Sequence, residues 1–427
     1  MKILVVGGGG REHAIIRKLK ESLQVEQIYC APGNGGISAD AVCVPVKATD
    51  IEGMVALVKQ ERIDFAVVAP DDPLVLGMVD ALNAAGVATF GPDKLAARIE
   101  GSKVFSKNLM RKYGIPTAAY EVFDDPADAM AYIERQNTFP TVIKADGLAL
   151  GKGVIIAQNL EEARTGVHQI MEDKVFGASG NQVVVEEFLT GPEVSVLAFC
   201  DGKTIVPMVS AMDHKRALDG DQGLNTGGMG TVAPNLCYTP EVAQQCMEHI
   251  FLPTIQAMQA EGCPFSGCLF FGLMITPKGP YVIEYNCRFG DPETQVVLPL
   301  LESDLLEVML AIWEKRLNPA MVRFSQKHAA CVVLASGGYP QKYQTGLPIQ
   351  GLGTDGQPTQ GTATIYHAGT RYEDGQYLTA GGRVLGVTCT ADTPELALQA
   401  SYQAAKGISF EGMHLRRDIG ARNLAIK

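Results

Sequence analysis

The sequence predicts a multidomain protein: an N-terminal α/β domain, a central α+β domain and a small C-terminal domain that is β-rich but mixed α/β. Three observations support this prediction. The chain has 427 residues, enough for about three domains of ordinary size. Strand-like and helix-like segments alternate over the first hundred residues. Strand pairs dominate after residue 101, and strands and turns dominate from Ala329 onward. We therefore expect domains at 1–101, 102–325 and 326–427.

The first segment is typical of a Rossmann-like parallel sheet with helices on both faces. Turns rich in glycine or acids follow its strands, as in GGGGRE, APGNGG, APDDP and GPDK. Ligands of such sheets bind at the carboxyl ends of strands, so these turns are candidate binding sites. The expected strands are 2–6, 27–31, 42–46, 64–69 and 87–90, and the expected helices are 12–23, 51–59 and one that begins at Pro73.

The second segment opens with one long predicted helix over 94–113, closed by Gly114 and Pro116. Hairpin-forming strands follow it, and we expect a flexible lid subdomain at about 120–190. One helix is expected to begin near Leu160, and another near 395–405 lies in the last domain. The expected strands are 141–144, 154–157, 183–188, 193–199, 267–275 and 281–286.

Composition argues against several classes of function. With 36 Lys and Arg against 47 Asp and Glu, the net charge is −11, so nucleic acid is not an expected partner. The ten cysteines form no CxxC, and the seven histidines lack the spacing of zinc ligands. The apolar start is too short for a signal peptide, and no later run approaches a membrane span. These features predict reduced thiols and a cytoplasmic protein without a membrane partner, either a monomer or a small homo-oligomer.

The stretch ADGLALGKG, residues 145–153, combines glycines with a lysine, which is typical of phosphate binding. It is not a P-loop, because Asp146 stands where the first glycine is needed and Gly153 where Ser or Thr is needed. A β-branched strand follows it instead of a helix. The stretch therefore reads either as a hairpin tip whose backbone N–H groups cover a triphosphate or as an ordinary glycine-rich turn.

Acids and amides near two later strands support the first reading. Glu186 and Glu187 end one strand and Glu193 follows a turn later; they could hold ribose or could be solvated turn acids. In YVIEYNCRFGDPETQ, Glu284 and Asn286 share one face of a strand, because side chains alternate. A carboxylate and an amide oxygen suit Mg²⁺, which takes its other ligands from phosphates and water.

A dinucleotide-binding oxidoreductase is a rival hypothesis, because VVGGGGREHA places glycines between a strand and a helix. However, GxGxxG counted from Gly7 requires glycine where Glu12 stands, and the second strand ends without the acid that holds an NAD ribose. A non-catalytic nucleotide-binding or scaffold protein is a further alternative. Such a protein would have no use for the candidate metal ligands and phosphate-binding residues.

The sequence contains the motifs GGGGREHA, APGNGG, GSK (101–103), IKADGLALGKGV, EEFLTGPEVS, DHKR (213–216), NTGGMG (225–230), EYNCRFGDPETQ, IYHAGT and GGRVL. With these motifs the chain resembles the ATP-grasp superfamily, and most closely its phosphoribosylamine–glycine ligase family. The resemblance spans essentially the whole chain, and the combination of GREHA, DHKR, NTGGMG and CRFGDPETQ is its most specific part. Another carboxylate–amine ligase or a purine-pathway carboxylase of this superfamily remains an alternative.

The resemblance implies a central ATP-grasp fold and an ATP-dependent ligation in purine biosynthesis. Glycine carboxylate would attack the γ-phosphate of ATP, and the amine of 5-phosphoribosylamine would then attack glycyl phosphate. The expected small molecules are glycine, 5-phosphoribosylamine and ATP with Mg²⁺ or Mn²⁺. The enzyme's task would be positioning and charge neutralisation.

The resemblance also implies roles for particular residues. ATP would be held by Lys103, Lys144, Gly151, Lys152, Gly153, Glu186, Glu187, Phe188, Leu189 and Glu193. The metal would be held by Glu284 and Asn286. Catalysis would involve Arg288 at the γ-phosphate and, on the acyl-transfer side, Asp213, His214 and Lys215. Substrates would contact Gly9, Gly10, Arg11, Glu12, Pro32, Gly33, Asn34, Asp71, Asn225, Gly227, Gly228, Met229 and Asp291. His214 is either a general base for the incoming amine or a structural loop histidine.

Three positions depart from the family pattern. Gly8 replaces an asparagine, Asp71 replaces a glutamate and Leu224 replaces a proline. The first two lie where the phosphoribosyl substrate is expected, and the third removes some loop rigidity. In addition, the strand CLFFGLMI has no acid, so the metal would depend more on the phosphates.

Overall fold

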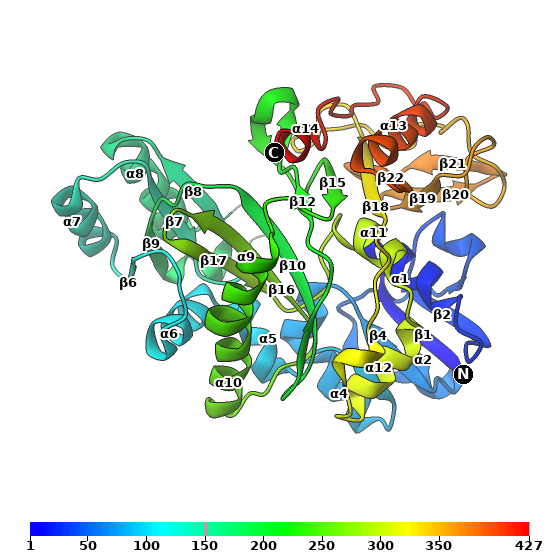
Figure 1. Cartoon of the computed structure of the whole chain (residues 1–427), viewed down its shortest axis with the longest axis horizontal. Helices are drawn as coiled ribbons and strands as arrows, with labels where there is room; N and C mark the ends of the chain where they lie inside the picture. The colour runs from blue at the N-terminus through cyan, green and yellow to red at the C-terminus, as the bar shows by residue number, and fades with distance from the viewer. Residues whose placement is uncertain (149–152, 427) are drawn as a thin grey trace.

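The computed structural model describes residues 1–148 and 153–426. It confirms the predicted fold class, with an N-terminal parallel sheet, a central part built on two four-stranded sheets and a small C-terminal sheet (Figure 1). The N-terminal sheet has the order β3-β2-β1-β4-β5 with parallel pairing throughout. The order in which its strands are connected reverses between β1 and β4, so their carboxyl ends form a switch point, where ligands of such sheets bind. Its strands are β1 (Lys2–Gly7), β2 (Gln27–Pro32), β3 (Val42–Cys43), β4 (Phe65–Val68) and β5 (Ala88–Phe90).

Helices cover both faces of this sheet, as predicted, but one prediction was wrong. The expected single helix over 94–113 is two helices, because Ser102 adopts an extended conformation between them. The Ser102 hydroxyl accepts from the N–H of Phe105 at 3.0 Å and so caps the second helix. The helices are α1 (Gly10–Leu19), α2 (Ile51–Glu61), α3 (Asp71–Leu76), α4 (Met78–Ala84), α5 (Lys94–Gly101) and α6 (Lys103–Tyr113).

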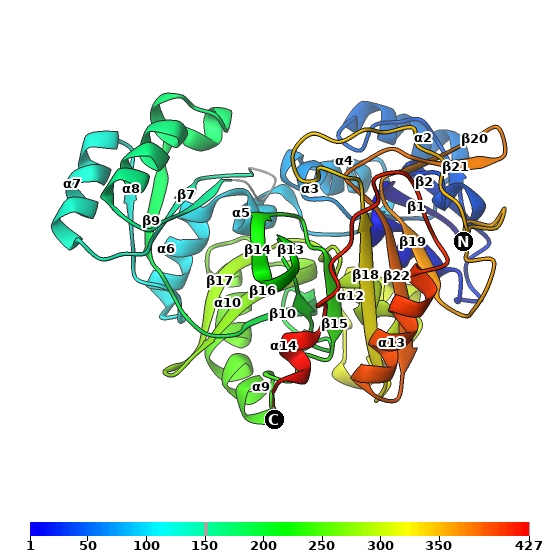
Figure 2. The ribbon, with the colours of Figure 1, turned by 90° about the horizontal axis from the view of Figure 1, so that it is seen from above.

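Two four-stranded sheets form the central part. One has the order β6-β9-β7-β8 and carries helices α7 (Pro126–Gln136) and α8 (Leu160–Val167); the other has the order β11-β10-β16-β17. They lie side by side in Figures 1 and 2, and helix α10 (Leu252–Ala260) covers the second. The strands are β6 (Tyr120–Phe123), β7 (Thr141–Ala145), β8 (Val154–Ala157), β9 (Val183–Glu187), β10 (Glu193–Asp201), β11 (Ile205–Pro207), β16 (Ser266–Thr276) and β17 (Gly279–Asn286).

The third sheet combines segments that are distant in the sequence. Its order is β12-β15-β18-β22-β19, so β12 (Met212–Asp213) and β15 (Gly230–Ala233) join strands of the last hundred residues. The latter are β18 (His328–Ala335), β19 (Thr364–His367) and β22 (Arg383–Ala391), covered by α13 (Pro394–Ala405). This pairing brings the DHKR and NTGGMG segments against the C-terminal part of the chain.

The remaining elements are short or peripheral. Strands β13 (Arg216–Leu218) and β14 (Gln222–Asn225) form one hairpin, and β20 (Thr370–Glu373) and β21 (Gln376–Thr379) form another. The other helices are α9 (Pro240–Cys246), α11 (Thr294–Val297), α12 (Leu305–Trp313) and α14 (Ala421–Leu424).

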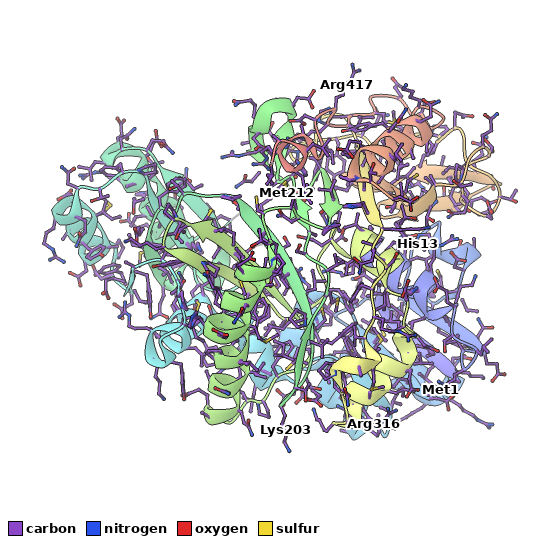
Figure 3. All side chains as sticks on the ribbon, viewed as in Figure 1. Met1, His13, Lys203, Met212, Arg316 and Arg417 are labelled. Carbon is purple, nitrogen blue, oxygen red and sulfur yellow. The ribbon has the colours of Figure 1, made fainter. Side chains whose placement is uncertain are left out.

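The N- and C-terminal parts are joined by a buried histidine contact. His13 of α1 lies where the blue and orange parts of the chain meet in Figure 3, and its Nδ1 accepts from the N–H of His367 at 2.8 Å. Both side chains are fully buried, which lowers the pKa of each. None of the helices in residues 1–148 and 153–426 is both long and apolar enough to cross a membrane.

Candidate active site

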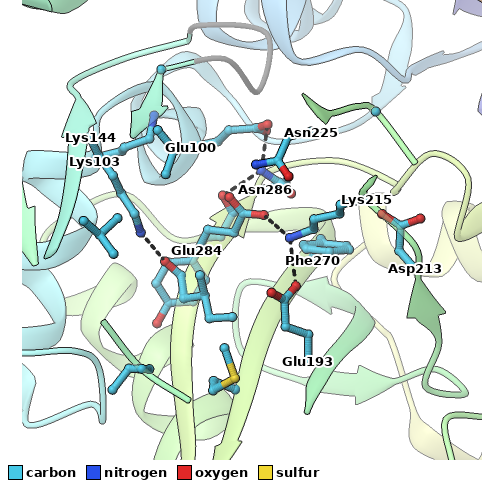
Figure 4. Close-up of a pocket in the computed structure, with 18 of the residues that line it drawn as sticks. Glu100, Lys103, Lys144, Glu193, Asp213, Lys215, Asn225, Phe270, Glu284 and Asn286 are labelled. Atoms are coloured by element: carbon cyan, nitrogen blue, oxygen red, sulfur yellow. Dashed lines mark hydrogen bonds and ion pairs between the residues drawn. The ribbon is translucent and has the colours of Figure 1, made fainter. Parts of the chain in front are cut away.

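A cavity of about 990 Å³ lies between the two central sheets and the third sheet. Figure 4 shows its side chains projecting from β7, β10, β17 and the segment after β12. Its volume is at the upper end of that of ordinary ligand sites. Charged groups of both signs line it, so it suits a polar, multiply charged ligand.

The floor of the cavity is β17, and a β-bulge determines which side chains it presents. The register with β16 slips here: Leu273 pairs with Val282, but Gly272 pairs with Glu284. A one-residue slip exchanges the faces of a strand. Val282 is therefore buried on the same side as Tyr285, while Glu284, Asn286 and Arg288 line the cavity.

Lys215 connects two acids at one end of the cavity. Its Nζ lies 3.1 Å from a Glu193 oxygen and 3.7 Å from a Glu284 oxygen, as Figure 4 shows. Glu193 and Glu284 together raise the pKa of Lys215 despite its burial. Burial raises the pKa of Glu284, but the surrounding lysines and Arg288 outweigh it and the net pKa is lowered. Glu284 is thus ionised at neutral pH, as a metal ligand needs.

A buried glutamate lies between two lysines at the opposite end. The Glu186 carboxylate is 2.9 Å from Lys107 Nζ and 3.0 Å from Lys144 Nζ. Lys144 also donates to the carbonyl of Ile283 at 3.1 Å. Glu186 is therefore not a solvated turn acid, whereas its neighbour Glu187 is exposed. Phe188 and Leu189 follow along the cavity wall.

The segment that enters the glycine-rich stretch is anchored to the start of α6. Asp146 accepts from the Ser102 hydroxyl and from the N–H of Val104, both at 3.0 Å. Lys103 Nζ donates to the carbonyl of Gly147 at 2.8 Å. The strands β7 and β8 pair antiparallel, so the stretch joins two hairpin strands. Gly151 and Lys152 lie outside the described residues, while Gly153 is buried and lines the cavity.

Two acids, one of them in the DHKR segment, lie in the cavity wall. Asp213 and Glu293 both line the cavity. Burial raises the pKa of each, and the charge of Glu293 raises that of Asp213 further. Ser195 donates to Glu293 at 3.0 Å. An ammonium group here would relieve the repulsion between the two carboxylates.

A second, shallower cavity lies at the carboxyl ends of β1 and β2. The predicted substrate residues Gly9, Arg11, Glu12, Pro32 and Gly33 all line it. Arg11 lines the large cavity as well, so the two cavities meet at this side chain. Asp71, Asn225, Gly227 and Asp291 line the large cavity instead. Six of its ten lining residues are glycines or prolines, so an anion can approach the backbone closely there.

The chain matches three family models that together span most of its length. Residues 1–100 match the phosphoribosylglycinamide synthetase N domain, residues 101–294 its ATP-grasp (A) domain and residues 329–422 its C domain. The chain belongs to this family. Its relatives are named phosphoribosylamine–glycine ligases. The relative from Caldanaerobacter subterraneus subsp. tengcongensis is 46% identical over 99% of this chain and 100% of that protein. The relative from Allochromatium vinosum is 47% identical over 100% and 99%.

Comparison with solved structures agrees with this family assignment. The phosphoribosylamine–glycine ligase of Thermotoga maritima superposes with a TM-score of 0.86 at 34% identity, covering 98% of this chain and 100% of that chain. A biotin carboxylase from Campylobacter jejuni has a TM-score of 0.77 at 14% identity, covering 97% and 92%. The second likeness shows only that the fold is shared.

Within this phosphoribosylglycinamide synthetase family site, His214 behaves as a structural histidine. It is fully buried and does not line the cavity. Its Nδ1 lies 3.0 Å from the carbonyl of Gly230, and its Nε2 accepts from the N–H of Gly420 at 3.0 Å. Burial lowers its pKa to about 4. Both nitrogens are occupied by backbone groups, so the geometry argues against the general-base hypothesis.

Four further predicted substrate residues lie outside both cavities. Asn34 uses its amide completely: Nδ2 donates to the carbonyls of Gly8 and His367, and Oδ1 accepts from two N–H groups. Met229 is a fully buried core residue, and its N–H donates to the carbonyl of His214 at 2.8 Å. Gly10 and Gly228 also line neither cavity. These four residues lie in the loops that form the site but line neither cavity.

The sequence interpretation missed several cavity residues because they come from elements with no recognisable phosphate or metal pattern. Arg383 lies at the start of β22, and its guanidinium donates to the carbonyl of Asp291 at 2.9 Å. The GGRVL motif that contains Arg383 is a signal that could have identified it. The missed residues include Glu100, Lys107, Glu293 and Arg383.

The donor set fits a hard divalent cation. Glu284 supplies a carboxylate, and no hydrogen bond within the described residues occupies Asn286 Oδ1. The described residues contain no group of three or more His, Cys, Asp or Glu arranged for a metal. Two protein oxygens plus phosphates and water is the usual environment of Mg²⁺ in phosphoryl transfer.

Proposed function

We propose that this chain ligates glycine to 5-phosphoribosylamine at the expense of ATP, giving glycinamide ribonucleotide, ADP and phosphate. The observation that carries the proposal is the meeting of the two cavities at Arg11. A phosphoryl-transfer site and an amine site must share an intermediate, and an acyl phosphate formed in one must be reachable from the other. The family and its named relatives supply the identity of the substrates.

ATP is proposed to lie across the large cavity. Glu186, Glu187, Phe188 and Leu189 would surround the adenosine, and Glu193 would bind the ribose. Lys103, Lys144 and Gly153 would face the phosphates, together with Gly151 and Lys152. Glu284 and Asn286 would hold Mg²⁺ or Mn²⁺, which neutralises phosphate charge when bound.

In the first step a glycine carboxylate oxygen would bond to the γ-phosphorus as the bond to the β-phosphate oxygen breaks. Arg288 is proposed to stabilise the transferring group, since its guanidinium lines the cavity next to Glu284 and Asn286. Asp213 is proposed to receive the glycine ammonium, because its buried carboxylate lies in the cavity wall with Glu293. Lys215 would orient Glu193 and Glu284 through its two ion pairs.

In the second step the amine of phosphoribosylamine would attack the acyl carbon from the small cavity, where Gly9, Arg11, Glu12, Pro32 and Gly33 lie. The bond from that carbon to phosphate oxygen then breaks. The amine loses one proton, which leaves with the phosphate as HPO₄²⁻. An acyl phosphate is activated enough to need no histidine base, which agrees with the position of His214.

The division of the chain into domains at residues 101 and 325 stays a prediction.

The test is ADP release by the purified chain with glycine and with phosphoribosylamine formed in situ from ribose 5-phosphate and ammonia. We expect turnover only when both are present and a product that contains the glycyl amide. Parallel reactions replace glycine with alanine or with bicarbonate. Equal turnover with either replacement would show that the substrate assignment is wrong.

A further inference from the structure

One buried carboxylate holds the end of β17 at three consecutive residues. Glu100, near the end of α5, accepts from Asn286 Nδ2 at 3.0 Å and from the N–H of Cys287 at 2.7 Å. The same carboxylate lies 3.2 Å from an Arg288 guanidinium nitrogen. Its side chain is 6% exposed. Glu100 therefore contacts a proposed metal ligand, the strand backbone and the proposed phosphoryl-binding arginine at once.

The chemistry of this contact fixes the orientation of the Asn286 amide. The Glu100 oxygen that faces Asn286 acts as a hydrogen-bond acceptor, so it turns the amide nitrogen toward itself. The second hydrogen on Nδ2 is directed at the carbonyl of Tyr285, 3.0 Å away. With both N–H groups of the amide committed, Oδ1 is the atom that remains for the cavity. A reversed amide would present a nitrogen that cannot bind a cation.

The same carboxylate also fixes Arg288. NH2 faces Glu100 and NH1 donates to the carbonyl of Phe289 at 3.3 Å. Nε is buried and has no hydrogen-bond partner within residues 1–148 and 153–426. A buried guanidinium nitrogen without a partner is costly, so the arrangement is suited to an anion that accepts from it. Glu100 thus holds both groups in the orientation that a metal–phosphate complex needs.

We propose that Glu100 is a positioning residue that orients Asn286 for the divalent cation and Arg288 for the phosphoryl group. The proposal rests on the proposed function only in requiring a nucleotide and a divalent cation; it does not depend on which carboxylate or amine is joined. Outer-shell partners of this kind are worth about 10- to 100-fold in metal affinity.

The experiment measures Mn²⁺ binding by electron paramagnetic resonance in the full chain with ADP, comparing the natural protein with Glu100→Gln. The substitution keeps the size of the side chain but replaces one of the two acceptor oxygens that face Asn286 and the N–H of Cys287 with a donor. We expect Mn²⁺ to bind about 10- to 100-fold more weakly, with unchanged ADP affinity in EDTA. Unchanged Mn²⁺ affinity in the folded variant would overturn the proposal. Because neither glycine nor phosphoribosylamine is present, failure of the substrate assignment cannot produce either result.

Two further variants separate orientation from general loosening. Ala97→Gly weakens the same helix at a fully buried position outside the cavity and is expected to leave Mn²⁺ affinity unchanged; a loss equal to that of Glu100→Gln would overturn the proposal. In the Asn286→Ala background, Glu100→Gln should add little, because its partner is gone. Fully additive losses would also contradict it. If Glu100→Gln does not fold, Glu100→Asp, whose shorter side chain loses its reach to Asn286, should show the same weakening.

Discussion

The two cavities meet at Arg11 but are built from different parts of the chain. The large cavity is formed by charged side chains that compensate one another, such as Lys215 between Glu193 and Glu284. The small cavity is formed largely by the backbone of glycine-rich turns after β1 and β2. Side chains can stabilise a changing charge distribution, whereas backbone groups offer a fixed shape and fixed dipoles. The difference fits a division between phosphoryl transfer and recognition of a phosphoribosyl group.

The largest expected effect comes from removing a charge in the large cavity. Glu284→Gln should lower turnover about 100-fold or more, because metal-mediated charge stabilisation is worth several kcal/mol. The variant should unfold at an unchanged temperature, since it is isosteric. The surface substitution Glu121→Gln, at a half-exposed side chain, serves as the control. Near-natural turnover at low Mg²⁺ would remove Glu284 from the metal site and weaken the contrast between the cavities.

The small cavity should respond to an added methyl group instead. Gly33 has φ +74°, and a β-carbon there would overlap Cys43 Sγ. Gly33→Ala should lower kcat/KM for phosphoribosylamine by about 10- to 100-fold through displacement of the loop, with unchanged ADP affinity. Gly86→Ala is the matched control. Gly86 has φ +87°, and a β-carbon there would have no atoms within 4 Å, so this substitution adds backbone strain without a steric clash. A parallel loss of ADP affinity in Gly33→Ala would show that the two cavities are not separable.

The smallest effect on activity is expected at His214, which lies behind the large cavity. Its unfolded pKa is about 6.5 and burial lowers the folded pKa to about 4. The unfolded chain therefore binds a proton that the folded chain rejects, and stability falls as pH decreases from about 6.5 toward 4. The slope from this group is at most about 1.4 kcal/mol per pH unit. Urea unfolding should show a shallower pH dependence in His214→Gln.

Turnover of the His214→Gln variant should stay near natural at pH 8, where His214 of the natural protein is neutral in both the folded and the unfolded chain. The pH profile of kcat should keep its shape. A loss of about 100-fold in kcat by the folded variant, the size expected of a general base, would return His214 to the chemistry. In that case a residue behind the wall of the large cavity would take part in catalysis.

The backbone pattern of the site was largely predictable because it depends on local signals. Alternating strands and helices, the turns after β1 and β2, and the hairpin around residues 145–153 follow from periodicity and from glycine and proline positions. The break at Ser102 was missed, although serine followed by a helical run is an N-cap signal. The slip in β17 was not predictable, because a bulge depends on the partner strand. Glu284 and Asn286 still share a face, since the extra residue precedes both.

The sequence by itself determined the fold class, the family and many of the polar residues that line the large cavity, because these are recorded in motifs and in local periodicity. Only the tertiary structure decided which of those residues face a cavity. Asn34, Met229 and His214 belong to motifs, yet their polar groups are satisfied internally or their side chains are buried. Glu100 belongs to no site pattern, yet it contacts two site residues, Asn286 and Arg288, and the backbone between them. Burial and hydrogen-bond partners come from contacts between segments up to hundreds of residues apart, and no local pattern contains them.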